Sequence, residues 1–267
     1  MRELTLQEIK EVELQLLRRF HNFCVENNIR YFISHGTLLG ALRYQAFIPW
    51  DDDLDVLVPR EDYDRLLSIY PDDEQFKLFA PEKDSSYYYP YAKFCDMSTR
   101  KDESDYNNGV ELGIDIDVFP LDYWDDDLEK AKLEVKKQRR NIFFLGLAKL
   151  KKPDSLHPFK RFVKGLAMKV VKLYGSAYYV EQIMKGANKP EQKGSRYLGS
   201  KVWNLYGERD IIPAEAFSEA IELEFEGQKF FAPVGYDVFM SSLYGDYMPE
   251  PPVEKRKTHH SFKAYRL

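Results

Sequence analysis

The sequence WDDDLDVLVP, residues 50–59, is the strongest structural signal in this 267-residue chain. Four carboxylates within five residues lead directly into an apolar run, and Pro59 ends it. The pattern predicts a buried strand over residues 51–58, on which Asp53 and Asp55 point to the same face. Paired carboxylates suit Mg²⁺ or Mn²⁺, which take oxygen ligands and leave positions for substrate phosphates. A solvated acidic loop is the alternative, but burying one end of such a cluster without a cation would be costly.

A second acidic strand is predicted over residues 109–119, with Pro120 ending it. Asp115 and Asp117 alternate with isoleucines there, so the two carboxylates share one face. Placed beside the first strand, this one would complete a three-carboxylate site that suits phosphoryl or nucleotidyl transfer with two metal ions. Taken alone, the stretch is equally compatible with an edge strand whose acidic face lies in water.

Upstream of both strands, His35-Gly36-Thr37 lies between a predicted strand over residues 31–34 and a predicted helix. Glycine lets the backbone approach a phosphate, and a helix N-terminus favours an anion. Because turns use glycine constantly, this stretch carries weight only through its position just before the acidic residues.

The composition excludes several classes of protein. The chain is 44% apolar and 31% charged, which argues against disorder and provides material for a core. No run approaches the roughly 18 apolar residues of a membrane span, and the charged amphipathic N-terminus is unlike a signal peptide. With Cys24 and Cys95 as the only cysteines, we expect a reduced, cytoplasmic protein without a disulfide scaffold or cysteine-bound zinc. The net charge of −5 disfavours nucleic acid as a partner.

Charge is uneven along the chain. Residues 130–172 carry 14 basic residues against Glu134 and Asp154, a net charge of +12, so the remainder carries −17. A charged helix is predicted over residues 125–151, and a basic amphipathic helix over residues 159–173. The second helix has two interpretations: it binds an anionic membrane surface, or it packs on the core with a solvated basic face.

Several of these stretches resemble the LicD family of bacterial phosphocholine transferases, which is related to fukutin and fukutin-related protein. They are HGTLLGALR (35–43), FIPWDDDLD (47–55), PREDY (59–63), DIDVFPLD (115–122), YGDYM (244–248) and Pro251-Pro252. The matches run from about residue 31 to residue 252, so the resemblance covers nearly the whole chain.

Strands interleaved with helices indicate an α+β fold. The resemblance implies a nucleotidyltransferase-like form of it, in which a short mixed sheet is flanked by helices. We expect a catalytic core over residues 1–125 and a basic helical insertion over residues 126–190 as an appendage. Residues 191–267 would complete the domain.

The resemblance also implies roles for individual residues. Asp53 and Asp55 would be metal ligands and Asp117 the third carboxylate, around Mg²⁺ or Mn²⁺. Gly36 and Thr37 would hold the donor phosphate. The family uses a CDP-linked donor, typically CDP-choline, and attaches the phospho-alcohol to a hydroxyl of a glycan or lipid-linked glycan. Such an acceptor belongs to a cell-surface polysaccharide precursor, such as that of lipopolysaccharide or teichoic acid.

Other candidate substrate-binding residues are cations and aromatics near these motifs. Arg43, Arg60 and Lys93 are candidate phosphate partners, with an ordinary surface cation as the alternative for each. Trp50 and the run Tyr87–Tyr89 could form an aromatic cage for a quaternary ammonium, although packing is the commoner role of such residues. We expect His35, His259 and His260 to serve as hydrogen-bonding structure, because the mechanism requires no histidine.

A metal-dependent phosphotransferase is therefore the function we expect, with three others left open. A nucleotidyltransferase would use an NTP with the same carboxylates. A nucleotide-sugar glycosyltransferase with one Asp-x-Asp motif would need neither the Gly-Thr turn nor Asp117. A non-enzymatic glycan- or partner-binding module is disfavoured because all three aspartates are present. Membrane binding by the 159–173 helix would place the protein at the inner membrane face.

Overall fold

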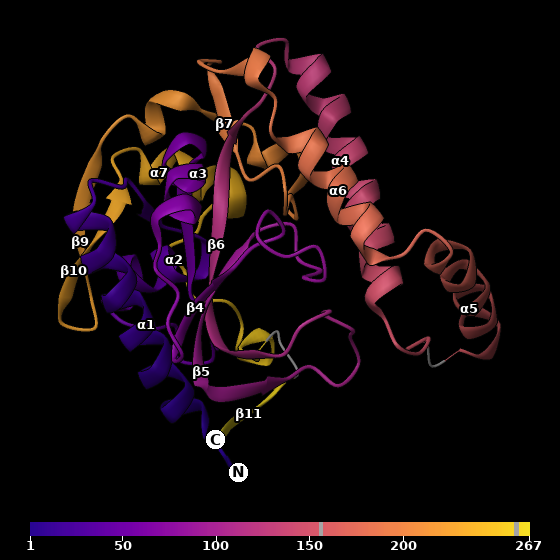
Figure 1. Ribbon diagram of the computed structural model, residues 1–267. Helices are drawn as coiled ribbons and strands as arrows, with labels where there is room; N and C mark the ends of the chain where they lie inside the picture. Colours follow the sequence, from indigo (N-terminus) through magenta and orange to yellow (C-terminus); the bar gives the residue numbers. More distant parts are fainter. Residues whose placement is uncertain (155–156, 259–261) are drawn as a thin grey trace.

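A curled mixed sheet organises the chain (Figure 1). The structure is a computed structural model that describes residues 1–154, 157–258 and 262–267. Along the main path of the sheet the strands are β1 (Arg2–Glu3), β11 (Lys263–Arg266), β5 (Ala92–Asp102), β6 (Leu112–Tyr123), β3 (Asp55–Pro59) and β2 (Phe32–Ile33). Off this path, β4 (Phe76–Phe79) pairs with β5, and β7 (Tyr197–Gly199) pairs with β6 and with β8 (Ile212–Pro213). A separate hairpin joins β9 (Ala220–Phe225) to β10 (Gln228–Pro233).

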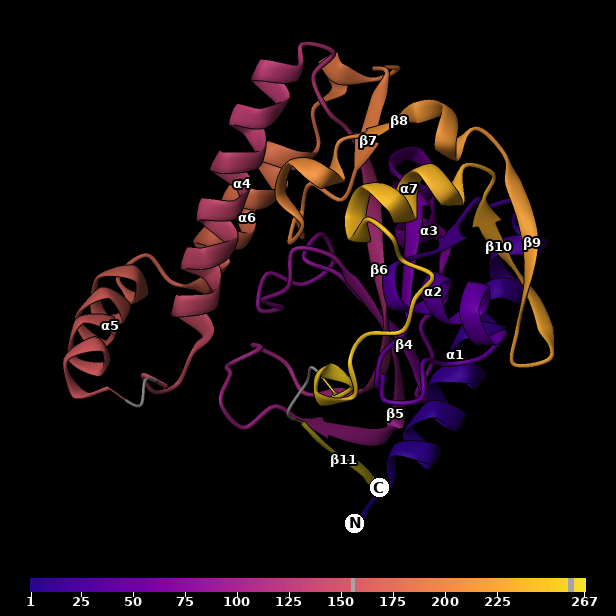
Figure 2. The ribbon, with the colours of Figure 1, turned by 180° about the vertical axis from the view of Figure 1, so that it is seen from behind.

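Helices lie on both sides of the sheet, with α1 on one side and α4 and α6 on the other (Figures 1 and 2). The α-helices are α1 (Leu6–Glu26), α2 (His35–Tyr44), α3 (Arg60–Ile69), α4 (Leu128–Lys149), α5 (Pro158–Lys172), α6 (Ser176–Ala187) and α7 (Tyr236–Tyr244). Short 3₁₀ helices are η1 (Pro190–Gln192), η2 (Gly207–Asp210), η3 (Ala214–Phe217) and η4 (Val253–Lys255). The predicted α+β class, a mixed sheet flanked by helices, is confirmed.

Helix α1 shows how local sequence sets the fold. Thr5 caps its N-terminus: the hydroxyl accepts from the backbone N–H of Glu8, whose carboxylate accepts from the backbone N–H of Thr5. One face of the helix, including Val12, Leu16 and Phe20, is fully buried against β5 and β6. Burial of each such side chain contributes on the order of 1.5–3 kcal/mol, so this face holds α1 on the sheet.

Strand β6 continues through Pro120 to Tyr123, so the prediction that Pro120 ends it is wrong. Proline lacks a backbone N–H and is tolerated where one side of a strand has no ladder to maintain. The pairing of β5 with β6 ends at Val118, and that of β7 begins at Asp122. Pro120 lies between these two ladders and opposes Val58 of β3 on its other side.

Strand β3 is shorter than predicted, because it begins at Asp55 and leaves residues 51–54 as a loop. Its partner β2 has two residues, which pair with Val56 and Leu57, so no ladder extends to the earlier aspartates. Asp53 therefore lies in a loop, whereas Asp55 is the first residue of a strand.

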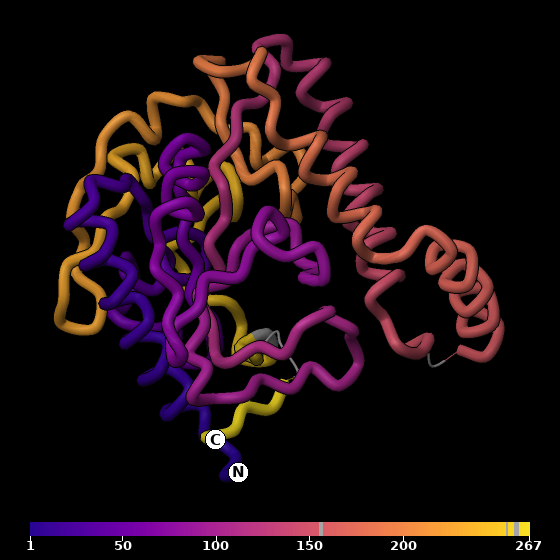
Figure 3. Tube along the Cα trace, viewed as in Figure 1, coloured from indigo at the N-terminus to yellow at the C-terminus, as the bar shows by residue number. Residues whose placement is uncertain are grey.

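Helices α4 and α5 and the start of α6, in the region where a basic insertion is predicted, extend away from the sheet (Figure 1). Figure 3 shows the chain leave the body of the fold along α4, turn through α5 and return along α6. Helix α4 is anchored by the buried Gln138, whose Nε2 donates to the carbonyls of Ile183 on α6 (2.9 Å) and Lys201 (3.3 Å). None of the described helices is both long and apolar enough to cross a bilayer.

A buried ion pair ties α3 to β6. Arg60 donates from Nε to Asp122 Oδ1 at 2.7 Å and from a terminal nitrogen to Oδ2 at 3.1 Å. Both side chains are almost fully buried, whereas Asp64, which Arg60 also contacts at 3.3 Å, is half-exposed. Each charge therefore depends on its partner for compensation.

We predict that Asp122→Ala lowers the free energy of unfolding by about 3–5 kcal/mol, because Arg60 would remain buried without its main counter-charge. Urea denaturation measures this loss. The matched variant Asp64→Ala removes the exposed partner of the same arginine and should cost at most about 1 kcal/mol. Equal losses in the two variants would contradict this account of the pair.

Candidate active site

A cavity of about 800 Å³ opens between the sheet and the C-terminal end of α4. Five aspartates contribute to its lining: Asp51, Asp53, Asp55, Asp115 and Asp117. Ile114 and Ile116, which alternate with the last two, lie in the core instead. The structure thus places the acidic faces of both predicted strands in one cavity.

The sheet register aligns the central groups of this cavity. β3 and β6 are parallel, and Asp55 lies directly opposite Asp117. β5 is antiparallel to β6, and Lys93 opposes Asp117 from the other side. Side chains that are directly opposite on neighbouring strands point to the same face. Asp55, Asp117 and Lys93 therefore form one row across three strands.

The backbone of Asp55 is fixed by the turn that precedes it in sequence. Its N–H donates to Thr37 Oγ1 at 2.8 Å, and its carbonyl accepts from the N–H of Ser34 at 3.0 Å. On the other strand, the N–H of Asp117 donates to the carbonyl of Leu54 at 2.8 Å. The start of α2 thus positions the acidic strand, a role of Thr37 that the sequence analysis missed.

Burial and mutual repulsion make these carboxylates unusually basic. Burial raises the pKa of Asp55 well above its usual range, and the charges of Asp53 and Asp117 raise it further. Burial also raises the pKa of Asp117, which Lys93 partly offsets, to about 6. Adjacent ionised carboxylates in a buried site are costly unless a cation compensates them.

Lys93 and Lys101 supply part of that compensation. The Lys93 ammonium donates to both Asp115 Oδ2 and Asp117 Oδ1, and Lys101 donates to Asp115 Oδ1 at 2.9 Å. Burial alone would raise the pKa of Asp115, but the two lysines hold it below its usual range. Asp115 is therefore neutralised by protein cations, whereas Asp117 shares one lysine with it.

The acidic loop before β3 is the second negative region of the cavity. Asp51, Asp52 and Asp53 each offer an oxygen, and these oxygens lie within 4.8 Å of one another. Beneath them, Glu13 on α1 is fully buried, and its Oε2 has no hydrogen-bond partner among the described residues. Burial, followed by the charge of Asp53, raises the pKa of Glu13. Clustered oxygen ligands beside an unpaired buried oxygen fit a hard divalent cation.

This loop cluster shares only Asp53 with the predicted triad of Asp53, Asp55 and Asp117. Gly36 explains how the loop approaches α2: a Cβ at that position would lie 2.6 Å from Asp51 Oδ2. Any side chain at position 36 would therefore displace the Asp51 carboxylate. The structure assigns the glycine a close carboxylate neighbour, and its contact with a donor phosphate stays a prediction.

The predicted phosphate cations are placed differently from one another. Lys93 and Arg43 line the cavity, but Arg43 also donates to the carbonyls of Tyr247 and Pro249 and so holds the C-terminal segment on α2. Arg60 is not part of the lining, because its guanidinium is engaged by Asp122. Of the three, only Lys93 belongs to the row that it forms with Asp55 and Asp117 across the sheet.

The predicted aromatic residues also separate. Trp50 lines the cavity, and the guanidinium of Arg256 lies 5.4 Å from the centroid of its ring. Tyr89 lines the cavity as well, whereas Tyr87 is a core residue stacked on Phe79. Both rings thus line the cavity with a protein cation beside them, Arg256 at Trp50 and Lys149 at Tyr89.

Several cavity residues were missed from sequence. Tyr206 and Tyr244 face each other with their hydroxyl oxygens 2.9 Å apart, and both line the cavity. Each belongs to a Leu-Tyr-Gly triplet, at residues 205–207 and 243–245, so the recurring triplet was the available signal. His35, expected to be structural, stacks on Tyr206, and its Nδ1 lies 3.0 Å from Ser34 Oγ. His259 and His260 lie outside the described residues.

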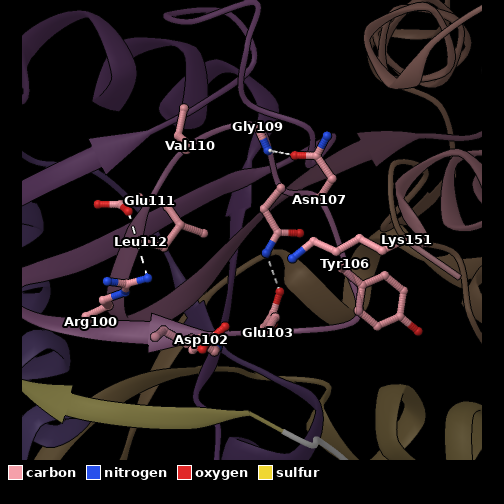
Figure 4. A pocket seen from close by; sticks show the side chains of 12 residues that line it. Arg100, Asp102, Glu103, Tyr106, Asn107, Gly109, Val110, Glu111, Leu112 and Lys151 are labelled. Atoms are coloured by element: carbon pink, nitrogen blue, oxygen red, sulfur yellow. Dashed lines mark hydrogen bonds and ion pairs between the residues drawn. The ribbon is translucent and has the colours of Figure 1, made fainter.

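A second pocket of about 250 Å³ adjoins the cavity (Figure 4). It is formed by the end of β5, the loop after it and the start of β6, and Lys101, Glu103 and Tyr106 line both spaces. Its other polar groups include Asn107. The Asn107 side-chain oxygen accepts a hydrogen bond from the backbone N–H of Gly109 at 3.1 Å. The pocket provides a polar extension of the acidic cavity.

Lys149, at the end of α4, brings the insertion into the cavity. Its ammonium lies 3.2 Å from the centroid of the Tyr89 ring, and the side chain is buried. Burial lowers the pKa of Lys149 to about 7, although Glu103 raises it in part. Helix α4 thus contributes a titratable amine to the lining of the cavity.

Comparisons with known proteins show what this sequence resembles. The family model described as the LicD/FKTN/FKRP nucleotidyltransferase domain matches residues 28–146. The chain is 30% identical over 275 aligned residues to the lipopolysaccharide cholinephosphotransferase LicD of Haemophilus influenzae, with 100% of both chains covered. It is 49% identical over 61 residues to an uncharacterized protein of Rickettsia prowazekii, which covers 23% of each chain. An uncharacterized protein of Rickettsia typhi is 45% identical over 73 residues, 27% of this chain and 23% of its own.

The buried amine of Lys149 predicts a pH dependence of stability. From about pH 7 upward to the usual lysine range, the unfolded chain holds a proton that folded Lys149 has released, so this residue makes stability rise with pH. Between pH 7 and pH 9 its contribution to the free energy of unfolding should grow by about 2 kcal/mol.

Urea denaturation at both pH values tests this prediction. Lys149→Met should lose the increment, while Lys137→Met, which removes an exposed lysine of the same helix, should keep it. A Lys149→Met protein whose stability changes with pH as in the unaltered chain would show that the amine has no unusual proton affinity.

Proposed function

The chain belongs to the LicD family, and from that premise we propose that it transfers a phospho-alcohol such as phosphocholine to a glycan hydroxyl. The proposed donor is CDP-linked, in the manner of CDP-choline. One observation carries the proposal: the parallel register of β3 and β6 sets Asp55 opposite Asp117 in a cavity that Asp53 also lines. Carboxylates converging from separate strands suit phosphoryl transfer.

We assign Mg²⁺ or Mn²⁺ to Asp53, Asp55 and Asp117. The fit rests on three observations: all three side chains line one cavity, the pKa values of Asp55 and Asp117 are raised, and the donor set is oxygen only. The clustered oxygens of the acidic loop belong to Asp51, Asp52 and Asp53, of which only Asp53 is part of this set. When bound, such an ion would neutralise the charge of the pyrophosphate donor. Side chains of the protein would accept the proton and bind the two substrates.

In the proposed reaction the acceptor hydroxyl oxygen forms a bond to the phosphorus that carries the alcohol. The bond from that phosphorus to the bridging pyrophosphate oxygen breaks, and CMP leaves with the electron pair. We propose that Asp117 accepts the hydroxyl proton or serves as a metal ligand, and its raised pKa supports either role. Lys93 and Arg43 would offset donor phosphate charge, and Gly36, which lines the cavity at the start of α2, would let the backbone approach the phosphate. Thr37 is buried and does not line the cavity, so it would act through the hydrogen bond that it accepts from the Asp55 N–H.

The lining of the cavity offers separate places for the two substrates. Trp50 and Tyr89 line the cavity, and a quaternary ammonium bound against these rings would take the positions that Arg256 and Lys149 hold in the structure. The polar pocket that shares Glu103 and Tyr106 with the cavity offers hydrogen-bonding groups for a glycan. Lipopolysaccharide is the acceptor class that the name of the Haemophilus relative supports.

Lys149 on α4 supports a functional role for the proposed insertion over residues 126–190, because it lines the cavity. We retain the core over residues 1–125 and the completing region over residues 191–267 as proposals. Peripheral attachment at the inner membrane face would bring a lipid-linked acceptor to the cavity.

A nucleotidyltransferase that uses an NTP is the second candidate. The description of the matching family model as a nucleotidyltransferase domain favours it. The two reactions release different products, since the first liberates CMP and the second pyrophosphate. Incubating the protein and Mg²⁺ with CDP-choline plus a glycan acceptor, and separately with NTPs, distinguishes them.

We predict that Asp53→Asn and Asp117→Asn each reduce CMP release by at least about 100-fold, because each removes charge stabilisation from the transition state. Isothermal titration with Mn²⁺ should show weakened binding in both variants. CMP release from CDP-choline in the presence of a glycan acceptor measures turnover.

Asp105→Asn is the matched control. Asp105 is an exposed carboxylate outside both pockets, so its variant should keep unaltered turnover and Mn²⁺ affinity. Unchanged CMP release in Asp53→Asn would remove that residue from the proposed site.

A further inference from the structure

Helix α5 exposes a continuous apolar face. Phe159, Phe162, Val163, Leu166, Val170 and Leu173 recur at the spacing of one helical face. All are exposed, and the largest values are 69% for Phe159, 71% for Phe162 and 84% for Leu173. Apolar patches of this extent on a soluble surface mark interaction sites.

The exposed face is not the one that holds α5 to the protein. Met168 and Val171, which are 4% and 6% exposed, are the buried residues of α5, and the helix contacts α4. With 3.6 residues per turn, these two positions lie on the side of the helix away from Phe159, Phe162 and Leu166. Helix α5 thus does pack on the core, but through Met168 and Val171, whereas its apolar face of Phe159, Phe162 and Leu166 stays exposed.

Basic side chains border the apolar face. Residues 157–173 contain Lys160, Arg161, Lys164, Lys169 and Lys172 and no acidic residue. By helical spacing, Lys160 and Lys169 fall on opposite flanks of the apolar stripe. Their aliphatic stems can lie along an apolar phase while the ammonium groups reach polar headgroups.

We propose that α5 docks the protein on an anionic lipid surface, with its apolar face in the headgroup–acyl boundary. Apolar side chains flanked by lysines match the two components of binding to such a surface, burial of apolar area and attraction to anionic headgroups. A second copy of the chain fits less well, because pairing two α5 faces would bring two wholly basic helices together.

The location of α5 connects this surface to the cavity. Leu145, Gly146 and Lys149 at the end of α4 line the cavity, and α5 follows α4 after a short connection. Figure 2 shows α5 beside that end of α4, away from the sheet. Tyr174 and Tyr178, both exposed, follow α5 in sequence, Tyr178 on α6, with their ring centroids 5.2 Å apart. Docking through α5 would therefore hold the cavity close to the lipid surface.

Co-sedimentation with vesicles tests the proposal and does not depend on the donor or the reaction. The full chain should bind vesicles of phosphatidylglycerol and phosphatidylcholine, bind pure phosphatidylcholine weakly, and lose affinity as salt rises. Because each basic residue contributes roughly a fivefold gain in partitioning, Lys160→Gln with Lys169→Gln should weaken binding by about 25-fold. Phe159→Ser with Phe162→Ser should remove detectable binding.

Matched controls are Leu133→Ser, an exposed apolar residue of α4, and Arg18→Gln, an exposed cation of α1. Both should bind vesicles as the unaltered chain does. The α5 variants should keep their melting temperature and their CMP release with a soluble glycan, since the altered side chains contribute to neither core nor cavity. No vesicle binding at low salt would overturn the proposal, as would a dimer in light scattering that Phe162→Ser dissociates.

Discussion

The structure depends on the parallel pairing of β3 with β6, which holds Asp55 directly opposite Asp117 at a buried surface. Like charges in this position repel, and burial adds a desolvation cost, so the arrangement is stable only with compensation. Backbone hydrogen bonds fix it from both sides: Thr37 accepts from the N–H of Asp55, and Leu54 accepts from that of Asp117. The fold thus maintains a site whose natural complement is a cation.

Within the described residues, lysine side chains compensate part of the negative charge of these aspartates and leave the rest without a directly paired lysine or arginine. Lys101 and Lys93 neutralise Asp115, and Lys93 also reaches Asp117. No ion pair with a lysine or arginine is found for Asp55 among the described residues, and its neutral neighbour His35 has a pKa that burial lowers to about 4. Asp115 is thus paired with two lysines, whereas Asp117 shares one lysine and Asp55 pairs with none in the described part of the chain. Asp55 and Asp117 are therefore the carboxylates of these three that could bind a ligand. This difference in lysine contacts gives Asp115 and Asp117, two residues apart on β6, different electrostatic environments.

Much of this site could be predicted from sequence because period-two alternation identifies which aspartates share a face. Alternation paired Asp115 with Asp117, and both line the cavity. It also paired Asp53 with Asp55 on one strand, but Asp53 lies in the loop before β3. The resemblance to the LicD family selected Asp117 as the third carboxylate. Alternation along one strand does not specify register between strands, so the row formed by Asp55, Asp117 and Lys93 required the structure. Arg60 shows the converse limit: its sequence position suggested a phosphate partner, but a carboxylate 62 residues later engages it. Tyr206 and Tyr244 meet across a tertiary contact that a repeated triplet hinted at but could not locate.

We propose above that Asp53, Asp55 and Asp117 together hold a divalent cation. The most direct measurement is anomalous diffraction from a crystal soaked in Mn²⁺, which locates the ion without assuming any activity. The account predicts a peak at coordination distance from oxygens of all three aspartates, with Lys93 displaced from Asp117. A peak confined to Asp51, Asp52 and Asp53, or no peak while Lys93 still bridges Asp115 and Asp117, would contradict it.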